Sequence, residues 1–446
     1  MQFNMPDVAP IFDVLQYGYS DGKNIQKFKA AWEYARDQYA KDFSHYLNLI
    51  ERIGFVKGEN AIDVGSGAGH WCMALAQFNK HVVGIDLNVE YIQISEIMAC
   101  NFPNGARIRF IQGTAEKINY PDLFFDYLIC HGVLMFTNHE IAIKEFSRIM
   151  RANGKIYIGY SGYGWYLHYI IKLGLIDNNM NRIKTGIKVL LNSFKYKYGL
   201  YDFRKPWLSM PLEDLEKLLN RFNFKIIDTP LLQDGFHDFI SYQATYDLVA
   251  VKTEDQETDW MTAPDISDEN LDEKLKNLIK IGLPNRVSAF IESNKLDHSN
   301  ERKWKFILAE AYIKEGKQEY SNAILSTLKP ESPYEFLIFG LNDQLNKNYS
   351  NAISYYSRVW EVDIPSVKFL RAECLRNMNQ IEDARDSYAD IIQEEKLALP
   401  AWIGLMACSF DFAGIQDLKR VVKSFLTTLI NSGKNADEIS ELINML

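Results

Sequence analysis

Hydrophobic and polar positions follow two different patterns along the chain. Up to about residue 252, short continuous apolar runs alternate with stretches of helical spacing. Beyond about residue 270, only helical spacing remains. The first pattern is typical of a parallel sheet covered by helices on both faces. We therefore expect an α/β, Rossmann-like, doubly wound sheet followed by an all-α domain.

Individual segments of the first half can be assigned from this pattern. The predicted strands are 60–65, 81–86, 107–113, 125–132 and 154–160, and closing strands of the same sheet are predicted in 224–232 and 245–252. The predicted helices are 68–78, 89–102, 140–152 and 211–222. An acidic, polar stretch at 253–270 interrupts the pattern and is interpreted as a linker. The predicted domains are therefore 1–252 and 271–446.

The second half carries a loose repeat. Gly340, Ala352 and Tyr356 have the same spacing as Ala372, Ala384 and Tyr388, and Gly404 follows Ala372 at the interval that separates Ala372 from Gly340. A third phrase is placed around Ala309 and Ala323, with a slightly longer turn. These phrases resemble the tetratricopeptide repeat (TPR), in which small residues let antiparallel helices pack closely. The resemblance implies a TPR-like solenoid, and an ordinary helical bundle is the alternative.

Composition narrows the functional classes. The 446 residues have a net charge of −9, whereas nucleic-acid-binding proteins usually present a basic face, so a nucleic-acid partner is not expected. The five cysteines form no CxxC pair, so neither a disulfide framework nor a metal site is predicted. The first residues lack the pattern of a signal peptide, and no apolar run is long enough to span a bilayer. We expect a reduced, cytoplasmic protein.

The glycine-rich segment "DVGSGAGHW", residues 63–71, is the main candidate for chemistry. It lacks the Gly-Lys-Ser/Thr of a phosphate-binding P-loop. His70 stands where a dinucleotide turn has its third glycine, and Asp63 would repel a pyrophosphate. An adenosyl ligand without phosphate fits better. The carboxylate of S-adenosylmethionine (SAM) can accept the backbone N–H groups of the turn. Its positive charge can be balanced by Asp63, and its ribose hydroxyls can donate to Asp86.

Residues 61–160 resemble the class I SAM-dependent methyltransferases. The resemblance rests on the glycine turn, on Asp86, on "GTAEKI" at 113–118, on "FDYLICHGVL" at 125–134 and on "IMRANGKIYI" at 149–158. Thr114 stands where the family usually has an acid in the segment 113–118, and Asn153-Gly154 stands where the family has a Pro-Gly pair. The cofactor-binding residues that follow are Asp63, Gly65, Ser66, Gly67, Gly69, Asp86, Leu87, Thr114, Ala115, Glu116, Cys130 and His131.

The methyl acceptor is less well defined. The Asn/Asp-Pro-Pro-Tyr/Phe motif of enzymes that methylate bases or glutamine amides is absent after 125–132, which disfavours such acceptors. His131 is expected at the end of the fourth strand, where an imidazole can take a proton from an attacking hydroxyl; the alternative is that it only packs against SAM. An aromatic-rich insertion at about 160–208 is expected to cover the site. Six residues are candidates for acceptor binding: Tyr17, Tyr19, Arg36, Tyr163, Trp165 and His168.

Together these features predict an active SAM-dependent methyltransferase. We expect O-methylation of a small-molecule or glycan-type acceptor, with the repeat domain docking a protein partner or an acceptor carrier. Two alternatives remain: a protein N-methyltransferase, and a non-catalytic adaptor that acts through its repeats.

Overall fold

The computed structural model describes residues 22–39, 42–200, 207–230, 238–253, 270–280, 284–296, 302–359, 364–434 and 436–446. Two compact units are present, and neither is continuous along the chain. The α/β unit consists of Met1–Gly162, Pro211–His237 and Thr245–Gln256. The helical unit consists of Tyr163–Met210, Asp238–Ala244 and Glu257–Leu446.

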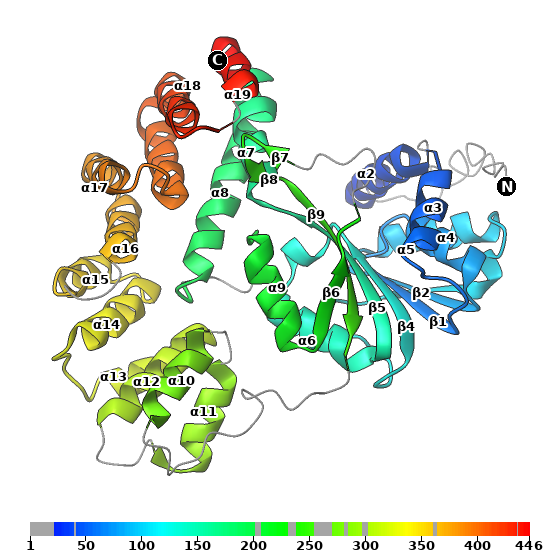
Figure 1. Cartoon of the computed structure of the whole chain (residues 1–446), viewed down its shortest axis with the longest axis horizontal. Helices are drawn as coiled ribbons and strands as arrows, with labels where there is room; N and C mark the ends of the chain where they lie inside the picture. The colour runs from blue at the N-terminus through cyan, green and yellow to red at the C-terminus, as the bar shows by residue number, and fades with distance from the viewer. Residues whose placement is uncertain are drawn as a thin grey trace. The chain divides into compact units, whose positions relative to one another are not determined.

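A seven-stranded sheet forms the centre of the α/β unit (Figure 1). Its strands lie in the order β3-β2-β1-β4-β5-β9-β6. Their bounds are β1 Asn60–Val64, β2 His81–Asp86, β3 Ile108–Gln112, β4 Phe125–His131, β5 Met150–Ser161, β6 Phe224–Asp228 and β9 Thr245–Lys252. The predicted Rossmann-like sheet is confirmed, and all seven strands overlap the predicted apolar runs. Strand β5 begins at Met150, inside the predicted helix 140–152, and β6 ends at Asp228, earlier than predicted.

The sheet is mixed, which corrects the prediction of a parallel sheet. Strands β1 to β5 are parallel, but β9 lies between β5 and β6 and is antiparallel to both. A parallel crossover needs a dozen or more residues, usually a helix. Among the described residues between β6 and β9 there is only a short hairpin, formed by β7 (Asp238–Phe239) and β8 (Tyr242–Gln243). The sequence predicts no helix between the strands 224–232 and 245–252, and this was a signal that the second of them is antiparallel.

Helices cover the sheet directly or in a second layer, since α2 packs against α5 and α3 packs against α4. The helices of this unit are α2 Gly22–Tyr39, α3 Ser44–Arg52, α4 His70–Phe78, α5 Val89–Cys100, α6 His139–Ile149 and α9 Leu212–Arg221, with short 3₁₀ turns at η1 Gly105–Arg107 and η2 Leu134–Phe136. Helix α4 is buried over most of its length, because it follows the glycine turn directly into the core. The carboxyl ends of β1 to β4 consequently meet at the edge of the sheet where the glycine turn lies.

The helical unit combines the insertion with the C-terminal half. The insertion contributes α7 Tyr163–Ile170, the π-helical segment η3 Ile171–Ile176 and α8 Met180–Tyr196. The C-terminal half contributes α10 Leu271–Lys280, α11 Pro284–Ser293, α12 Arg302–Lys314, α13 Gln318–Leu325, α14 Pro333–Leu345, α15 Tyr349–Tyr356, α16 Ile364–Asn377, α17 Ile381–Glu394, α18 Leu399–Asn431 and α19 Ala436–Met445. The described part of the C-terminal region is largely helical, as predicted, and the TPR-like solenoid stays a prediction. The boundary at 253–270 stays a prediction, since 254–269 lie outside the described residues.

The small residues of the repeat phrases lie at close helix contacts. A Cβ atom on Gly340 would lie 2.4 Å from the Tyr356 ring, and one on Gly404 would lie 2.4 Å from the Tyr388 ring. The third repeat, placed around Ala309 and Ala323, was misaligned with the other two in the sequence analysis, because Ala323 is exposed. Ser321 is the buried residue instead, and it follows Ala309 at the interval that separates Ala352 from Gly340. Its hydroxyl donates to Asn342 Oδ1 (2.7 Å), so a polar contact replaces an apolar one.

Candidate functional site

The glycine turn lies between β1 and α4 and packs against the loop after β4. Gly65 has a φ of +77°, a left-handed conformation that disfavours side chains. A Cβ atom there would lie 2.1 Å from Cγ2 of Val133. The turn and the end of β4 are therefore in direct contact, which brings together two of the segments singled out in the sequence.

Asp86, at the end of β2, is bonded to the same turn. Gly67 N–H donates to its Oδ2 (2.9 Å), and Asn88 N–H donates to its Oδ1 (2.9 Å). Burial raises the pKa of Asp86, although both hydrogen bonds act in the opposite direction. Ser95 Oγ on α5 donates to the carbonyl of Gly67 (2.8 Å), so both polar groups of the Gly67 backbone have partners. The sequence analysis missed Ser95; a small hydroxyl side chain between the apolar residues Ile94 and Ile97 of α5 was the available signal.

Asp63 lies beneath the turn and is buried. The Cys72 thiol donates to its Oδ2 (3.4 Å). Burial raises the pKa of Asp63 to about 7, an effect that this hydrogen bond only partly offsets. Neither Asp63 Oδ1 nor the buried Ser66 Oγ has a hydrogen-bond partner among the described residues. A buried carboxylate next to the turn favours a ligand that brings positive charge.

Helix α2 covers the turn with aromatic side chains. A Cβ atom on Gly67 would lie 3.2 Å from the Tyr34 ring, and Tyr34 meets Tyr91 edge to face with ring centroids 5.5 Å apart. Tyr39 O–H donates to the carbonyl of Ala68 (2.9 Å). The sequence analysis missed both tyrosines. The buried Ala31 lies two helical turns before Tyr39, and this spacing marks the face of α2 that packs inward.

The segment after β3 lies at the next strand end. Gly113 N–H donates to the backbone carbonyl of Asp86 (2.9 Å), which joins this segment to the end of β2. Thr114 forms an isolated bridge with Lys117, and Ala115 is buried. The Glu116 carboxylate accepts the N–H of Asn138 (3.1 Å).

Leu87, directly after Asp86, is one of the few large apolar side chains in the unit that are mostly exposed (64%). An exposed apolar side chain at this strand end is available to pack on a flat ligand surface.

His131 lies exposed at the end of β4, where the sequence placed it. Its ring lies nearly parallel to Tyr157 (centroids 6.1 Å apart, 12° between planes) and 5.6 Å from Trp71. A Cβ atom on Gly159 would lie 2.1 Å from Cδ2 of His131, so the ring occupies the space that a side chain on β5 would fill. The sequence analysis missed Gly159, although a glycine inside a strand often marks such a close approach. Tyr157 is held in turn by a hydrogen bond to Asp247 (2.6 Å).

His139, the first residue of α6, has different surroundings from His131. His139 is buried, which lowers its pKa to about 4. In its neutral form, Nδ1–H donates to the carbonyl of Thr137 (3.1 Å), and Nε2 accepts the Tyr160 hydroxyl (2.9 Å). It is therefore a core residue and not a helix-surface histidine. Cys130 is likewise buried, which raises the pKa of its thiol.

The predicted acceptor-binding residues do not converge within one unit. Tyr163, Trp165 and His168 belong to α7 of the helical unit, where the His168 ring lies 5.1 Å from that of Phe239. Arg36 is exposed on α2 and pairs with Asp37 (3.4 Å). Tyr17 and Tyr19 lie outside the described residues.

No group of three or more His, Cys, Asp or Glu side chains in the described ranges could hold a metal ion. None of the helices in these ranges has the length and apolar character to cross a membrane.

Comparison with known proteins agrees with this geometry. A family model described as a methyltransferase domain matches residues 55–184. The uncharacterized methyltransferase YcgJ of Bacillus subtilis (strain 168) is 25% identical over 199 residues, which cover 44% of this chain and 74% of YcgJ. The N-terminal half of this protein is a class I SAM-dependent methyltransferase domain. Its methyl donor is SAM.

Further relatives of the methyltransferase domain cover smaller segments. A demethylmenaquinone methyltransferase of Geobacillus sp. (strain WCH70) is 30% identical over 113 residues, 24% of this chain; this chain spans about half the length of that relative (48%). Among solved structures, YcgJ of B. subtilis aligns at 18% identity over 47% of this chain and 99% of that chain, with a TM-score of 0.33. A SAM-dependent methyltransferase from Methanosarcina mazei aligns at 19% identity over 44% of this chain and 93% of that chain, with a TM-score of 0.32.

Proposed function

We propose that this protein binds SAM along the carboxyl ends of β1, β2 and β3 and transfers its methyl group to an acceptor hydroxyl beside His131. The acceptor class is a small molecule or a glycan. The observation that carries the proposal is the convergence of the glycine turn, Asp86 and His131 at neighbouring strand ends. The protein N-methyltransferase and the non-catalytic adaptor are the competing functions.

The polar groups of the turn match the parts of SAM. Asp86 uses one lone pair of each carboxylate oxygen for a backbone N–H and keeps others for the two ribose hydroxyls. Ala115 and Thr114, at the end of β3, are placed for the adenine edge, and Leu87 for its face. Asp63 complements the positive charge of the methionine end. Tyr34 would cover bound SAM from the side of α2.

SAM supplies an electrophilic methyl group on a sulfonium. In the proposed reaction, the acceptor oxygen forms a bond to that carbon as the carbon–sulfur bond breaks, and the acceptor proton passes to a ring nitrogen of His131. An exposed ring that is fixed by Tyr157, Trp71 and Gly159 is suited to this task, because in-line displacement depends on positioning. An adaptor would not need an exposed histidine held in this way.

The C-terminal helices are proposed to act as a TPR-like array that docks a partner or an acceptor carrier. The tight contacts at Gly340 and Gly404 support this proposal, because they allow neighbouring helices to pack closely. Docking would raise the local concentration of the acceptor without adding any group to the chemistry.

The proposal is tested with the full-length protein in two steps. Calorimetry with SAM and with its demethylated product measures binding, and transfer of labelled methyl groups into cell fractions, followed by mass spectrometry of the product, identifies the methylated atom. We expect micromolar binding and a methylated oxygen. A methylated nitrogen would favour the N-methyltransferase, and SAM binding with no transfer into any fraction would favour the adaptor.

A His131→Ala variant tests the proposed base. We expect its turnover to fall by roughly 10²–10⁴-fold while its SAM affinity stays near that of the wild type. A change of only a few-fold would leave positioning of the acceptor as the source of the rate.

A further inference from the structure

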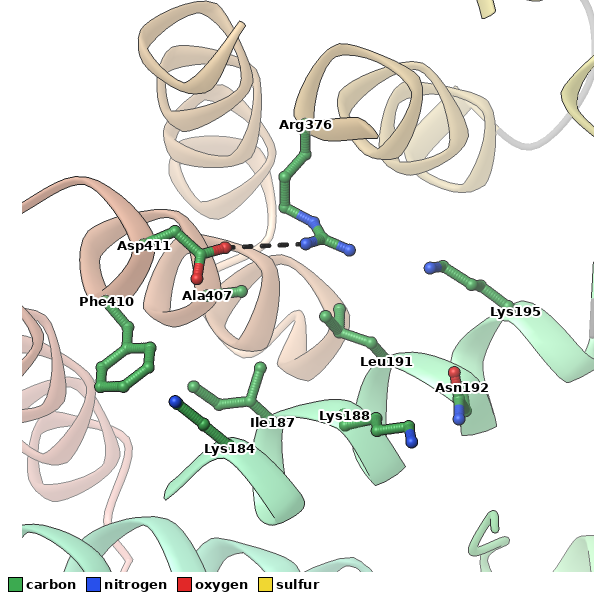
Figure 2. Close-up of a pocket in the computed structure, with 10 residues that line it drawn as sticks. All are labelled: Lys184, Ile187, Lys188, Leu191, Asn192, Lys195, Arg376, Ala407, Phe410 and Asp411. Atoms are coloured by element: carbon green, nitrogen blue, oxygen red, sulfur yellow. Dashed lines mark ion pairs between the residues drawn. The ribbon is translucent and has the colours of Figure 1, made fainter. Parts of the chain in front are cut away.

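The helical unit contains a cavity of about 270 Å³ between α8 and the helices α16 and α18. Figure 2 shows α8 along one side of this cavity and Arg376, Asp411 and Phe410 on the other. The lining residues on α8 are Lys184, Ile187, Lys188, Leu191, Asn192 and Lys195; those on α16 and α18 are Arg376, Ala407, Phe410 and Asp411. All of them belong to the helical unit, and Lys184 is the last residue that the methyltransferase family model matches.

One face of α8 supplies three lysines to this cavity. Lys184 and Lys188 are one helical turn apart, and Lys195 follows two turns further along the same face. Apolar Ile187 and Leu191 lie between them on the same stripe. The sequence therefore places cations and apolar carbon side by side on one surface of the helix.

Only part of this positive charge is balanced. Lys195 pairs with Glu373 on α16 (2.7 Å), a residue that is fully buried. Arg376 pairs with Glu373 (3.0 Å) and with Asp411 (3.8 Å). Lys184 and Lys188 are exposed, and among the described residues neither has an ion pair. Four cations thus face two carboxylates, which leaves two positive charges.

The opposite wall adds apolar surface. Ala407 is buried, and Phe410 is half-buried with its ring beside the cavity. With Ile187 and Leu191, these side chains form an apolar floor below the lysines. Such a combination favours a ligand that has both an anionic group and a carbon skeleton or ring.

We propose that this cavity binds the phosphoryl group of a small phosphorylated molecule. A phosphoryl or diphosphoryl group carries two or more negative charges, which matches the two unbalanced cations, whereas a single carboxylate would offset only one of them. Lysine is a common point-charge ligand for phosphate, and Lys184 and Lys188 are the two cations that would contact it, because the Arg376 guanidinium is already bonded to Glu373. The cavity is slightly smaller than the usual range of about 300–1,000 Å³ for drug-sized ligands, so the bound portion is small. This site is separate from the proposed methyl transfer.

The test uses the full-length protein and calorimetry at low salt, with inorganic pyrophosphate, uridine diphosphate and phosphatidylglycerol vesicles as probes. We expect pyrophosphate and uridine diphosphate to bind, and uridine diphosphate to bind more tightly because its ring can contact Phe410. In the double variant Lys184→Ala/Lys188→Ala, the Kd of both should rise about tenfold or more. SAM binding should be unchanged, which shows that the variant is folded.

A matched control removes the same charge elsewhere. Lys280 on α10 and Lys396 before α18 are exposed and do not line the cavity. The double variant Lys280→Ala/Lys396→Ala should bind pyrophosphate within about twofold of the wild type, because general electrostatic attraction changes equally in both variants. Equal losses in both double variants, or no pyrophosphate binding by the wild type, would overturn the proposal. Binding to vesicles without binding to pyrophosphate would overturn the assignment to a small molecule.

Discussion

The backbone N–H of Gly67 donates a 2.9 Å hydrogen bond to Oδ2 of Asp86 and thereby ties the glycine turn after β1 to the end of β2. The two residues are far apart in sequence, and the parallel pairing of β1 with β2 brings them together. Because the carboxylate is oriented by backbone donors, its remaining lone pairs have fixed directions. A ligand that uses them need not order the side chain on binding.

The buried Asp63 makes stability depend on pH. Its folded-state pKa of about 7 lies above the ordinary value of 3.8, so the folded protein binds the proton more tightly than the unfolded protein. The stability that this group contributes is fully present below about pH 4 and is lost as the pH rises to 7. We expect Asp63→Asn to remove this loss and to raise the free energy of unfolding at pH 7 by on the order of 2–4 kcal/mol. Urea denaturation at pH 4, 5.5 and 7 measures the difference between the two proteins. A constant difference across this range would contradict the account.

His139 makes the stability of the protein depend on pH in the opposite direction from Asp63, over an overlapping pH range. Its folded-state pKa of about 4 lies below the ordinary value of 6.5, so its contribution to stability is present above about pH 6.5 and is lost as the pH falls to 4. We expect His139→Gln, which keeps a donor and an acceptor, to be less sensitive to acid than the wild type. Thermal melts at pH 7 and pH 5 test this. If the variant loses as much stability on acidification as the wild type does, the buried neutral histidine is not the cause.

The His131 ring occupies the space next to Gly159, so Gly159 is proposed as a positioning residue for this histidine. Gly159→Ala should displace the ring, because the added Cβ would lie 2.1 Å from Cδ2 of the imidazole. We expect kcat for methyl transfer to fall by about tenfold or more, with little change in SAM affinity. The double variant Gly159→Ala/His131→Ala separates this effect from a general structural one. If Gly159 acts through His131, the double variant should be no slower than His131→Ala alone. A further loss of rate in the double variant would show a different role for Gly159.

Glu373 is the central ionic group of the helical unit. Burial alone would raise the pKa of this carboxylate, but Lys195 and Arg376 beside it lower the pKa below the ordinary value. The Tyr388 hydroxyl also donates to it (2.6 Å). Glu373→Ala would leave Lys195 and Arg376 without their main partner, so we expect a loss of about 3–5 kcal/mol in the free energy of unfolding. Chemical denaturation followed by circular dichroism measures this loss. Loss of under 1 kcal/mol would mean that water or Asp411 replaces the carboxylate.

Much of the α/β unit could be predicted because its signals are local. The apolar runs located β1 to β5, β6 and β9, and the glycine turn and Asp86 lie at the ends of the first two of these runs. The direction of β9 depends on what connects it to β6, and the missing helical segment carried that information. Ser321 was missed for a similar reason, because the alignment of the third repeat assumed an apolar small residue at the helix contact.

Other features depend on contacts between distant segments and had weaker signals. The glycine in β5 indicates a close approach, but only the pairing of β4 with β5 identifies His131 as the neighbour of Gly159. The inward face of α2 could be read from the spacing of Ala31 and Tyr39, whereas its packing on the glycine turn could not. The insertion groups with the C-terminal helices through residues such as Lys195 and Glu373, and no local pattern predicts that pair.

The central claim is that SAM binds where the glycine turn meets Asp86, and calorimetry of the full-length Asp86→Ala and Asp86→Asn variants tests it most directly. We expect Asp86→Ala to weaken SAM binding by about 2–4 kcal/mol, because two charge-assisted hydrogen bonds to the ribose are lost. Asp86→Asn keeps one hydrogen-bond acceptor, so we expect it to lose less SAM affinity than Asp86→Ala. Asp37→Ala, which removes an exposed carboxylate from the same unit, should bind SAM as the wild type does. If Asp86→Ala has an unchanged thermal melt and still binds SAM with wild-type affinity, the cofactor lies elsewhere and the account is wrong.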